Sequence, residues 1–307
     1  MTSNIRLSKD RLFKGKLFKG SIVALVTPMK NDGQIDYDGL RQLIDWHIES
    51  GTDALVIMGT TGESASVTKQ EHLAIVKSAI EHTNKRIPII AGCSSPSTQN
   101  TLELAEALNE LRPDALLCVT PYYIKPMQEG LYQHFSLIAE VSNAPIILYN
   151  VPARTACDLE NETLIRLASN SNIIGIKDAV ADIPRAKQLM GALGSDFCFL
   201  SGDDHSAYEY MLAGGTGVIS VTGNIAPKQM SRWCQLLLDK ELVESKALFE
   251  SLIPLHDAMF IESNPIPVKW VLNKMAKIDL GIRLPLTQPS VDAQQRIESI
   301  MQKCGIL

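Results

Sequence analysis

The stretch Asn172-Ile-Ile-Gly-Ile-Lys177-Asp178 places a lysine at the end of a short apolar run. Runs of this kind are typical of buried strands, and lysine is rarely buried unless its ammonium is paired or takes part in chemistry. Loss of hydration lowers the pKa of an amine from about 10.4, and a lysine with a pKa of roughly 7–8 is a nucleophile for carbonyl groups. A lysine that extends to the surface and pairs with Asp178 is the competing interpretation, which this stretch alone favours.

Outside this stretch, strand-like apolar runs and helical patterns alternate along the chain from Gly20. Continuous apolar strands that alternate with helices predict a parallel sheet with helices on its faces. Eight such units in about 220 residues predict an α/β fold, a closed (β/α)8 TIM barrel. The predicted strands cover residues 21–27, 53–58, 87–92, 114–120, 145–149, 172–177, 197–201 and 217–221. The predicted helices cover residues 37–49, 69–82, 99–111, 129–141, 162–168, 183–193, 205–212 and 227–238, with Asp36, Thr68, Ser97 and Asn161 as candidate N-caps.

An open, doubly wound sheet is the alternative arrangement of such units. That fold would place a Gly-x-Gly-x-x-Gly phosphate-binding turn after the first strand. The chain has Val26-Thr-Pro-Met29 at this position, so the closed barrel is preferred and no dinucleotide cofactor is expected.

The predicted domain organisation has three parts. Residues 1–19 are a basic N-terminal arm or extension that lacks the continuous apolar core of a secretory signal. Residues 20–226 form the barrel, whose eighth helix continues to residue 240. Residues 241–307 form a small C-terminal helical region, with helices predicted over 241–260, 266–277 and 290–303.

Composition and charge exclude several classes of function. The 307 residues are 45% hydrophobic and carry a net charge of −5, with acidic and basic residues mixed, which argues against a nucleic-acid surface. No apolar run approaches the roughly 18 residues of a membrane span. The cysteines form no Cys-x-x-Cys pair and the histidines lack metal-ligand spacing. We therefore expect no metal, reduced cysteines and a cytoplasmic location.

Chemically competent residues follow several predicted strands, and in a barrel of this kind the active site lies at the carboxyl ends of the strands. The turn Gly59-Thr60-Thr61-Gly62 offers hydroxyl and N–H groups that suit a carboxylate. Tyr149 ends the strand before that of Lys177, where a phenol could shuttle a proton beside a cationic imine. Arg154 could hold a second carboxylate. An ordinary turn, a core tyrosine and a surface arginine are the structural alternatives, but together these groups supply what a Schiff-base lysine needs.

These residues lie in stretches that resemble the pyruvate-dependent class I aldolase family. The resemblance runs in order from residue 20 to about residue 304, and the pair Tyr149 and Lys177 is the signature of the family. The matching stretches are Ser21-Ile-Val-Ala-Leu-Val-Thr-Pro28, Gly59-Thr-Thr-Gly-Glu-Ser64, Pro121-Tyr-Tyr123, Tyr149-Asn-Val-Pro152 with Arg154, Gly175-Ile-Lys177, Ser201-Gly-Asp-Asp204 and Asn264-Pro-Ile-Pro-Val-Lys269. The resemblance implies a TIM barrel with a C-terminal helical region, assembled as a homotetramer from two tight dimers.

The resemblance also implies the catalytic residues. Pyruvate would condense with Lys177 to form an imine and then an enamine. Tyr149 would pass protons, aided by Thr60 and by Tyr123 of the partner subunit.

The substrate-binding residues are implied in the same way. Thr61, together with Thr60, would hold the carboxylate of pyruvate, and Gly202 and the backbone of Ile219 would line the pocket. Arg154 would bind the carboxylate of L-aspartate 4-semialdehyde. The enamine would attack this aldehyde in a step of lysine and diaminopimelate biosynthesis.

Two alternative functions are compatible with parts of this pattern. Members of the family that resemble N-acetylneuraminate lyase tend to carry serine where Thr60 stands and lack an arginine at position 154. Thr60 and Arg154 therefore favour an enzyme that acts on L-aspartate 4-semialdehyde over such a lyase. A non-catalytic barrel that only binds ligands would be expected to lose Lys177 or Tyr149, and both are present.

Two departures from the family pattern lead to further expectations. Some members are inhibited by lysine at a dimer-interface site, with which Ser64, Ala65, His72 and Tyr122 agree. Lys69, Pro96 and Asn100 replace the expected His, Asn and Glu. Because a carboxylate is lost and a cation gained, we expect weak or absent feedback by lysine. Related enzymes often begin near Leu17, so residues 1–16 are interpreted as an upstream extension or a misplaced start.

Overall fold

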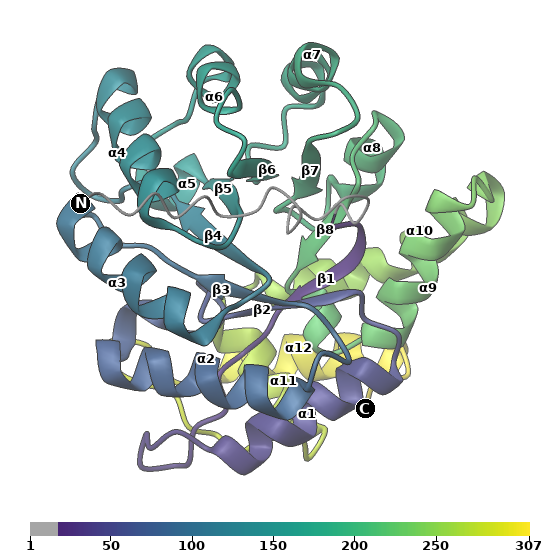
Figure 1. The fold of residues 1–307 in the computed structure, drawn as a ribbon. Helices are drawn as coiled ribbons and strands as arrows, with labels where there is room; N and C mark the ends of the chain where they lie inside the picture. Colours follow the sequence, from purple (N-terminus) through teal and green to yellow (C-terminus); the bar gives the residue numbers. More distant parts are fainter. Residues whose placement is uncertain (1–17) are drawn as a thin grey trace.

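A closed barrel of eight parallel strands forms the centre of the molecule (Figure 1). The computed structural model describes residues 18–307. Strand β1 pairs with both β2 and β8, which closes the barrel. The predicted TIM barrel is therefore confirmed, and the open-sheet alternative is wrong. The strands are β1 (Gly20–Ala24), β2 (Ala54–Ile57), β3 (Ile89–Gly92), β4 (Ala115–Val119), β5 (Ile146–Asn150), β6 (Ile173–Asp178), β7 (Cys198–Ser201) and β8 (Gly217–Ser220).

Helices surround the barrel and continue beyond its last strand. The helices between and after the strands are α1 (Tyr37–Glu49), α2 (Lys69–Thr83), α3 (Thr98–Leu111), α4 (Gln128–Val141), α5 (Pro152–Thr155), α6 (Asn161–Leu167), α7 (Ile183–Leu193), α8 (Ala207–Leu212) and α9 (Pro227–Leu238). The short 3-10 helices η2 (Ser64–Ser66) and η3 (Thr222–Asn224) follow β2 and β8. The C-terminal helices α10 (Leu242–Met259) and α11 (Ile266–Lys274) contact η3, and both contact α12 (Val291–Lys303). These contacts bring the C-terminal region to the carboxyl end of β8.

Three of the four predicted N-caps are confirmed. The side chains of Asp36, Thr68 and Ser97 each accept a hydrogen bond from a backbone N–H of the first helical turn, which satisfies an otherwise unpaired donor. The prediction for Asn161 is wrong, because Glu160 occupies the cap position and Asn161 is the first helical residue. The Asn161 amide instead donates to the carbonyl oxygen of Arg185 on α7, and thereby links two neighbouring helices.

The hydrophobic core has two layers, one inside the barrel and one between the strands and the helices. On β1, Ile22 belongs to the inner cluster and Val23 to the outer one. Because both faces of each strand are buried, the strands are continuous apolar runs in the sequence. Phe18 belongs to the inner cluster. The rest of the predicted arm up to residue 17, and with it the predicted upstream extension, lies outside the described residues.

The remaining general expectations concern membranes and cysteines. Among residues 18–307, no helix has the length and apolar character needed to cross a membrane. All six cysteines are free thiols, five of them buried and Cys304 partly exposed.

Candidate active site

Lys177 and Tyr149 lie side by side at the carboxyl ends of β6 and β5. Their Cα atoms are partners in the parallel register, and the Lys177 Nζ atom lies over the Tyr149 ring, 4.2 Å from its centroid. Only 5% of Lys177 is exposed. The carboxylate of Asp178 accepts the backbone N–H of Val180 at 3.0 Å. The competing interpretation, a surface lysine paired with Asp178, is therefore wrong.

The environment of Lys177 produces an amine that is partly neutral near pH 7. Burial lowers its pKa from 10.5 to about 7, because the ammonium form loses its hydration. The negative charge of Asp204 opposes this shift, whereas the positive charge of Arg154 adds to it. A lysine in this state is a nucleophile for a ketone, as the sequence predicts.

Tyr149 remains a phenol at neutral pH. Burial raises its pKa to about 12, although the charge of Arg154 and the hydrogen-bonding Thr60 hydroxyl both lower it. A protonated phenol next to a lysine can donate a proton to a leaving hydroxide and take one back. Thr60 is therefore the residue that links Tyr149 to the turn after β2.

The turn after β2 has a constrained backbone. Met58 and Glu63 have φ values of 59° and 60°, in the left-handed region that costs free energy for residues with a side chain. The N–H of Glu63 donates to the carbonyl oxygen of Thr60 at 3.0 Å, and that of Gly62 to Gly59 at 3.1 Å. A Cβ atom at Gly62 would lie 3.2 Å from the Met58 backbone, so the turn has little room to change.

Asn264 joins the two groups that are predicted to bind carboxylates. Its side-chain amide donates to the Thr61 hydroxyl at 2.9 Å, and its backbone carbonyl oxygen accepts a hydrogen bond from the Arg154 guanidinium at 3.3 Å. The sequence analysis assigns Asn264 no role. In the sequence, Asn264 is marked only by its place in the stretch 264–269, which resembles the family. Its bond to Thr61 joins residues 203 positions apart, so no local pattern predicts it.

Gly202 packs directly on the stem of Lys177. A Cβ atom at Gly202 would lie 3.0 Å from Lys177 Cε and 2.9 Å from Ala179 Cβ, so a larger residue would displace the lysine. Ile219 is buried in β8, where it pairs with Ile22 on the opposite side from β7.

Tyr123 lies apart from the other predicted residues. It is 88% exposed, and its N–H donates to the Thr155 carbonyl oxygen at 3.3 Å. A single chain therefore brings together Lys177, Tyr149, Thr60, Arg154 and Gly202, but not Tyr123.

A cavity of about 820 Å³ opens beside these residues. Thr60, Tyr149, Arg154 and Asn264 line it, whereas Lys177 is not among the lining residues and lies beyond the Tyr149 ring. The same cavity is also lined by residues compared above with the lysine-inhibition site, namely Ser64, Ala65, Lys69, His72, Asn100 and Tyr122. Lys69 Nζ donates to the carbonyl oxygen of Glu103 at 3.2 Å in this part of the cavity.

Asp204 is a second residue to which the sequence analysis assigns no role. It is buried, and its Oδ2 atom accepts the N–H groups of Val221 at 3.0 Å and Thr222 at 2.9 Å. Its Oδ1 atom is buried without a hydrogen-bond partner among residues 18–307. The charge of Asp204 is thus kept close enough to raise the pKa of Lys177.

The chain is similar to known proteins over nearly its whole length. The model of the dihydrodipicolinate synthetase family matches residues 17–304. The 4-hydroxy-tetrahydrodipicolinate synthase of Coxiella burnetii is 49% identical over 286 residues, which cover 93% of this chain and 98% of that protein. The enzyme of the same name from Pseudomonas aeruginosa is 48% identical over 287 residues, covering 94% and 98%.

A solved structure shows the same agreement in three dimensions. Dihydrodipicolinate synthase from Acinetobacter baumannii, crystallised with pyruvate, has a TM-score of 0.93 at 50% identity, and the match covers 95% of this chain and 100% of that chain. The matched residues extend from β1 to α12 and include every strand end that contributes to the site. The chain belongs to the dihydrodipicolinate synthetase family.

Proposed function

We propose that this lyase condenses pyruvate with L-aspartate 4-semialdehyde through a Schiff base on Lys177, giving 4-hydroxy-tetrahydrodipicolinate for lysine and diaminopimelate biosynthesis. The observation that carries the proposal is a buried lysine with a pKa of about 7, lying over the ring of Tyr149 at the carboxyl ends of the strands. The curated relatives are synthases by name, and the Acinetobacter enzyme binds pyruvate, which favours the synthase over a lyase for N-acetylneuraminate.

The first half of the reaction forms the nucleophile. The free amine of Lys177 attacks the C2 carbonyl of pyruvate, and loss of water leaves a cationic imine. Loss of a proton from C3 then neutralises the imine and gives an enamine. The Tyr149 phenol protonates the departing hydroxide, and the phenolate that results takes up the proton from C3. The face of its ring stabilises the cation beside it.

The second half joins the two substrates. The C3 carbon of the enamine attacks the aldehyde carbon, and the aldehyde oxygen takes up a proton and becomes the 4-hydroxyl group. The amino group of the aldehyde substrate then attacks the imine carbon, closes the ring and releases the amine of Lys177. Thr60 and Thr61 hold the carboxylate of pyruvate, and the Arg154 guanidinium binds that of the aldehyde by a bidentate pair.

The active unit is a homotetramer built from two tight dimers, in which Tyr123 of the partner subunit completes each proton relay. The 88% exposure of Tyr123 supports this assignment, as do the exposed apolar residues Ile124 and Met127 in the same loop. Six free thiols support a reducing, cytoplasmic compartment.

The decisive experiment is pyruvate consumption by the purified protein with either L-aspartate 4-semialdehyde or N-acetylmannosamine. We expect turnover with the semialdehyde alone and none in Lys177→Ala, with borohydride trapping pyruvate on Lys177.

Arg154→Ala should weaken the binding of the aldehyde substrate by about 2–3 kcal/mol, which corresponds to roughly a 30- to 160-fold loss in kcat/KM. Arg166→Ala, which removes an exposed ion pair with Glu129, is the control. Failure to turn over the semialdehyde would refute the proposal.

The role of Tyr123 has its own test, because mixed oligomers can combine two inactive chains. Tyr123→Phe and Lys177→Ala are each expected to be inactive as pure oligomers. When subunits exchange, a chain with Lys177 intact can receive Tyr123 from a Lys177→Ala chain, so activity should return on mixing. Activity that stays absent, in mixtures shown by sedimentation to have exchanged, would contradict a tyrosine shared across the interface.

A further inference from the structure

Glu63 combines two features that are unfavourable in isolation. It follows the Gly59-Thr60-Thr61-Gly62 turn with a φ of 60°, in the left-handed region. Its side chain is fully buried, and a buried carboxylate needs partners to offset its lost hydration. We therefore expect contacts around Glu63 that offset both the strained backbone and the lost hydration of its carboxylate.

The compensating contacts come from the C-terminal region. Lys269 on α11 is also buried, and its Nζ atom lies 2.5 Å from Glu63 Oε1. The backbone N–H of Arg283 donates to Glu63 Oε2 at 3.3 Å. Burial lowers the pKa of Lys269, and the adjacent Glu63 carboxylate opposes that shift. Glu63 is thus bound by two residues that lie more than two hundred positions away in the sequence.

The same C-terminal segment also contacts the turn at Thr61. The Asn264 amide donates to the Thr61 hydroxyl at 2.9 Å, two residues before Glu63. The N–H of Glu63 in turn donates to the carbonyl oxygen of Thr60. The segment from Asn264 to Lys269 therefore fixes the turn at two points, on either side of Gly62.

We propose that Glu63 and Lys269 are positioning residues, whose buried ion pair holds the turn so that the Thr60 and Thr61 hydroxyls face the carboxylate of the keto acid. This inference rests on the proposed function, in which that turn binds pyruvate. An ion pair suits the task because its short, directional contact fixes one geometry, whereas buried pairs add little net stability compared with apolar residues. The C-terminal helices thus complete the active site of the barrel.

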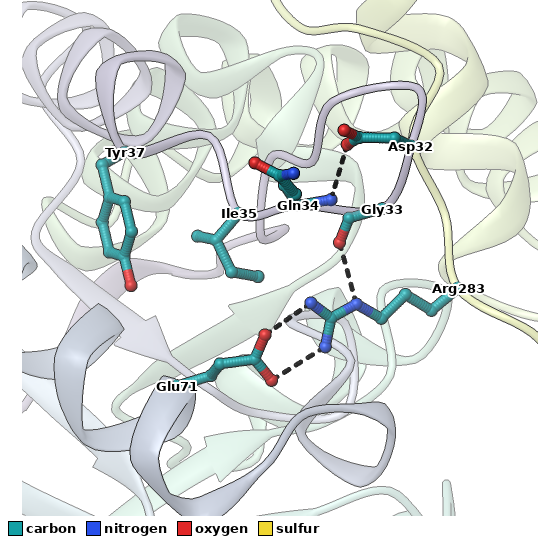
Figure 2. A pocket seen from close by; sticks show the side chains of 7 residues that line it. All are labelled: Asp32, Gly33, Gln34, Ile35, Tyr37, Glu71 and Arg283. Carbon is teal, nitrogen blue, oxygen red and sulfur yellow. Dashed lines mark hydrogen bonds and ion pairs between the residues drawn. The ribbon is translucent and has the colours of Figure 1, made fainter.

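A neighbouring ion pair provides a matched control. Figure 2 shows the Arg283 guanidinium bound by both carboxylate oxygens of Glu71, with its Nε atom donating to the Gly33 carbonyl oxygen at 2.9 Å. This pair is partly exposed and joins the C-terminal region to α2. It contacts neither Thr60 nor Thr61. The two pairs therefore connect similar parts of the chain, but only the buried pair includes the Glu63 side chain, which Arg283 contacts through its backbone N–H and not through its guanidinium.

The test compares the double variant Glu63→Gln/Lys269→Met with Glu71→Gln. Replacing both members of the buried pair leaves no unpaired charge, so the double variant is designed to fold. We expect its KM for pyruvate to rise roughly 10- to 100-fold, because small misplacements of a binding group cost that much. Its KM for the aldehyde should stay within twofold. In Glu71→Gln the melting temperature should fall while both KM values stay near those of the wild type.

The outcomes separate positioning from stability. A folded double variant with an unchanged KM for pyruvate would overturn the inference, and so would an equal rise in KM in Glu71→Gln. Should the double variant not fold, Lys269→Arg keeps the charge but changes the contact, and the same KM criterion applies to it. Borohydride trapping of pyruvate by the wild type tests the proposed function separately, since its absence there would refute the reaction and not the ion pair's role.

Discussion

Burial is the main cause of the low pKa of Lys177, and two opposing charges adjust it. Arg154 lowers its pKa together with burial, whereas the Asp204 carboxylate raises it. In the proposed reaction the amine must be neutral to attack pyruvate, but the imine that forms is a cation. The Asp204 carboxylate therefore stabilises the cationic imine, but it also lowers the fraction of Lys177 that is present as the free amine.

Asp204→Asn should reveal this balance in the pH profile. An amide oxygen can still accept the N–H groups of Val221 and Thr222, so the loop is preserved while the charge is lost. Without the anion the pKa of Lys177 falls further below about 7, and the acid limb of kcat/KM for pyruvate shifts to lower pH. In Asp203→Asn, whose carboxylate binds Ser206, the limb should not move. An unshifted limb in Asp204→Asn would contradict the electrostatic role.

Residues at strand ends could be predicted from the sequence, because a lysine or tyrosine that ends an apolar run is conspicuous. Lys177 and Tyr149 are of this kind. Asn264 and Asp204 could not be predicted, because their effects depend on contacts that no local pattern reveals. Asn264 reaches Thr61 from 203 positions away, and Asp204 acts through space on another strand.

At the scale of elements, the starts of α2 and α3 carry the residues from which we expect a weak response to lysine. Lys69 begins α2, and its Nζ atom lies 3.9 Å from the Glu103 carboxylate on α3. Lys69 and Asn100 both line the cavity beside the proposed active site. A cation at Lys69 repels the ammonium groups of a lysine ligand, and Asn100 supplies no carboxylate to offset that repulsion.

We therefore expect lysine to inhibit this enzyme weakly or not at all. The measurement is initial rate against lysine concentration at saturating pyruvate. Lys69→His, which restores the expected residue at one position, is the comparison and should be no less sensitive than the wild type. Half-inhibition of the wild type at sub-millimolar lysine would show that the altered site still binds it.

Long helices and strands could be predicted from the sequence more reliably than short ones. Long strands and helices have a clear period, so each predicted strand overlaps an observed one. The helix α5 was missed because four residues after Val151 are too few to show any period. This omission matters, since Arg154 lies on α5 and its orientation toward Asn264 follows from that turn.

For the whole molecule, the sequence predicts the barrel because both faces of its strands are buried. The packing of the C-terminal helices could not be predicted, because their amphipathic patterns do not specify which surface they cover. The contacts of Lys269 with Glu63 and of Arg283 with Glu71 join this region to the turn after β2 and to α2. The C-terminal region thus contacts the turn that the proposed function assigns to the binding of pyruvate.

The whole molecule also has a defined response to acid, set by buried histidines. Burial lowers the pKa of His47 to about 3 and those of His72 and His134 to about 4, against 6.5 for an exposed imidazole. Between pH 6.5 and 4 the unfolded chain binds protons that the folded chain does not, so stability is lost as pH falls through this window. Each histidine contributes a slope of about 1.4 kcal/mol per pH unit.

His47→Asn isolates one of these contributions. His47 is completely buried, and its Nδ1 atom hydrogen-bonds with the Thr52 hydroxyl at 3.0 Å, a contact that the amide of Asn can replace. Urea unfolding from pH 6.5 to 5, at one fixed protein concentration, should show a slope of stability against pH that is shallower than the wild type's, by a difference that grows to about 1.4 kcal/mol per pH unit near pH 5. Between pH 7 and 8 the two slopes should agree, because the imidazole is neutral in both states there. Equal slopes below pH 6.5 would mean that His47 takes up its proton without unfolding, and that the core around α1 admits a charge.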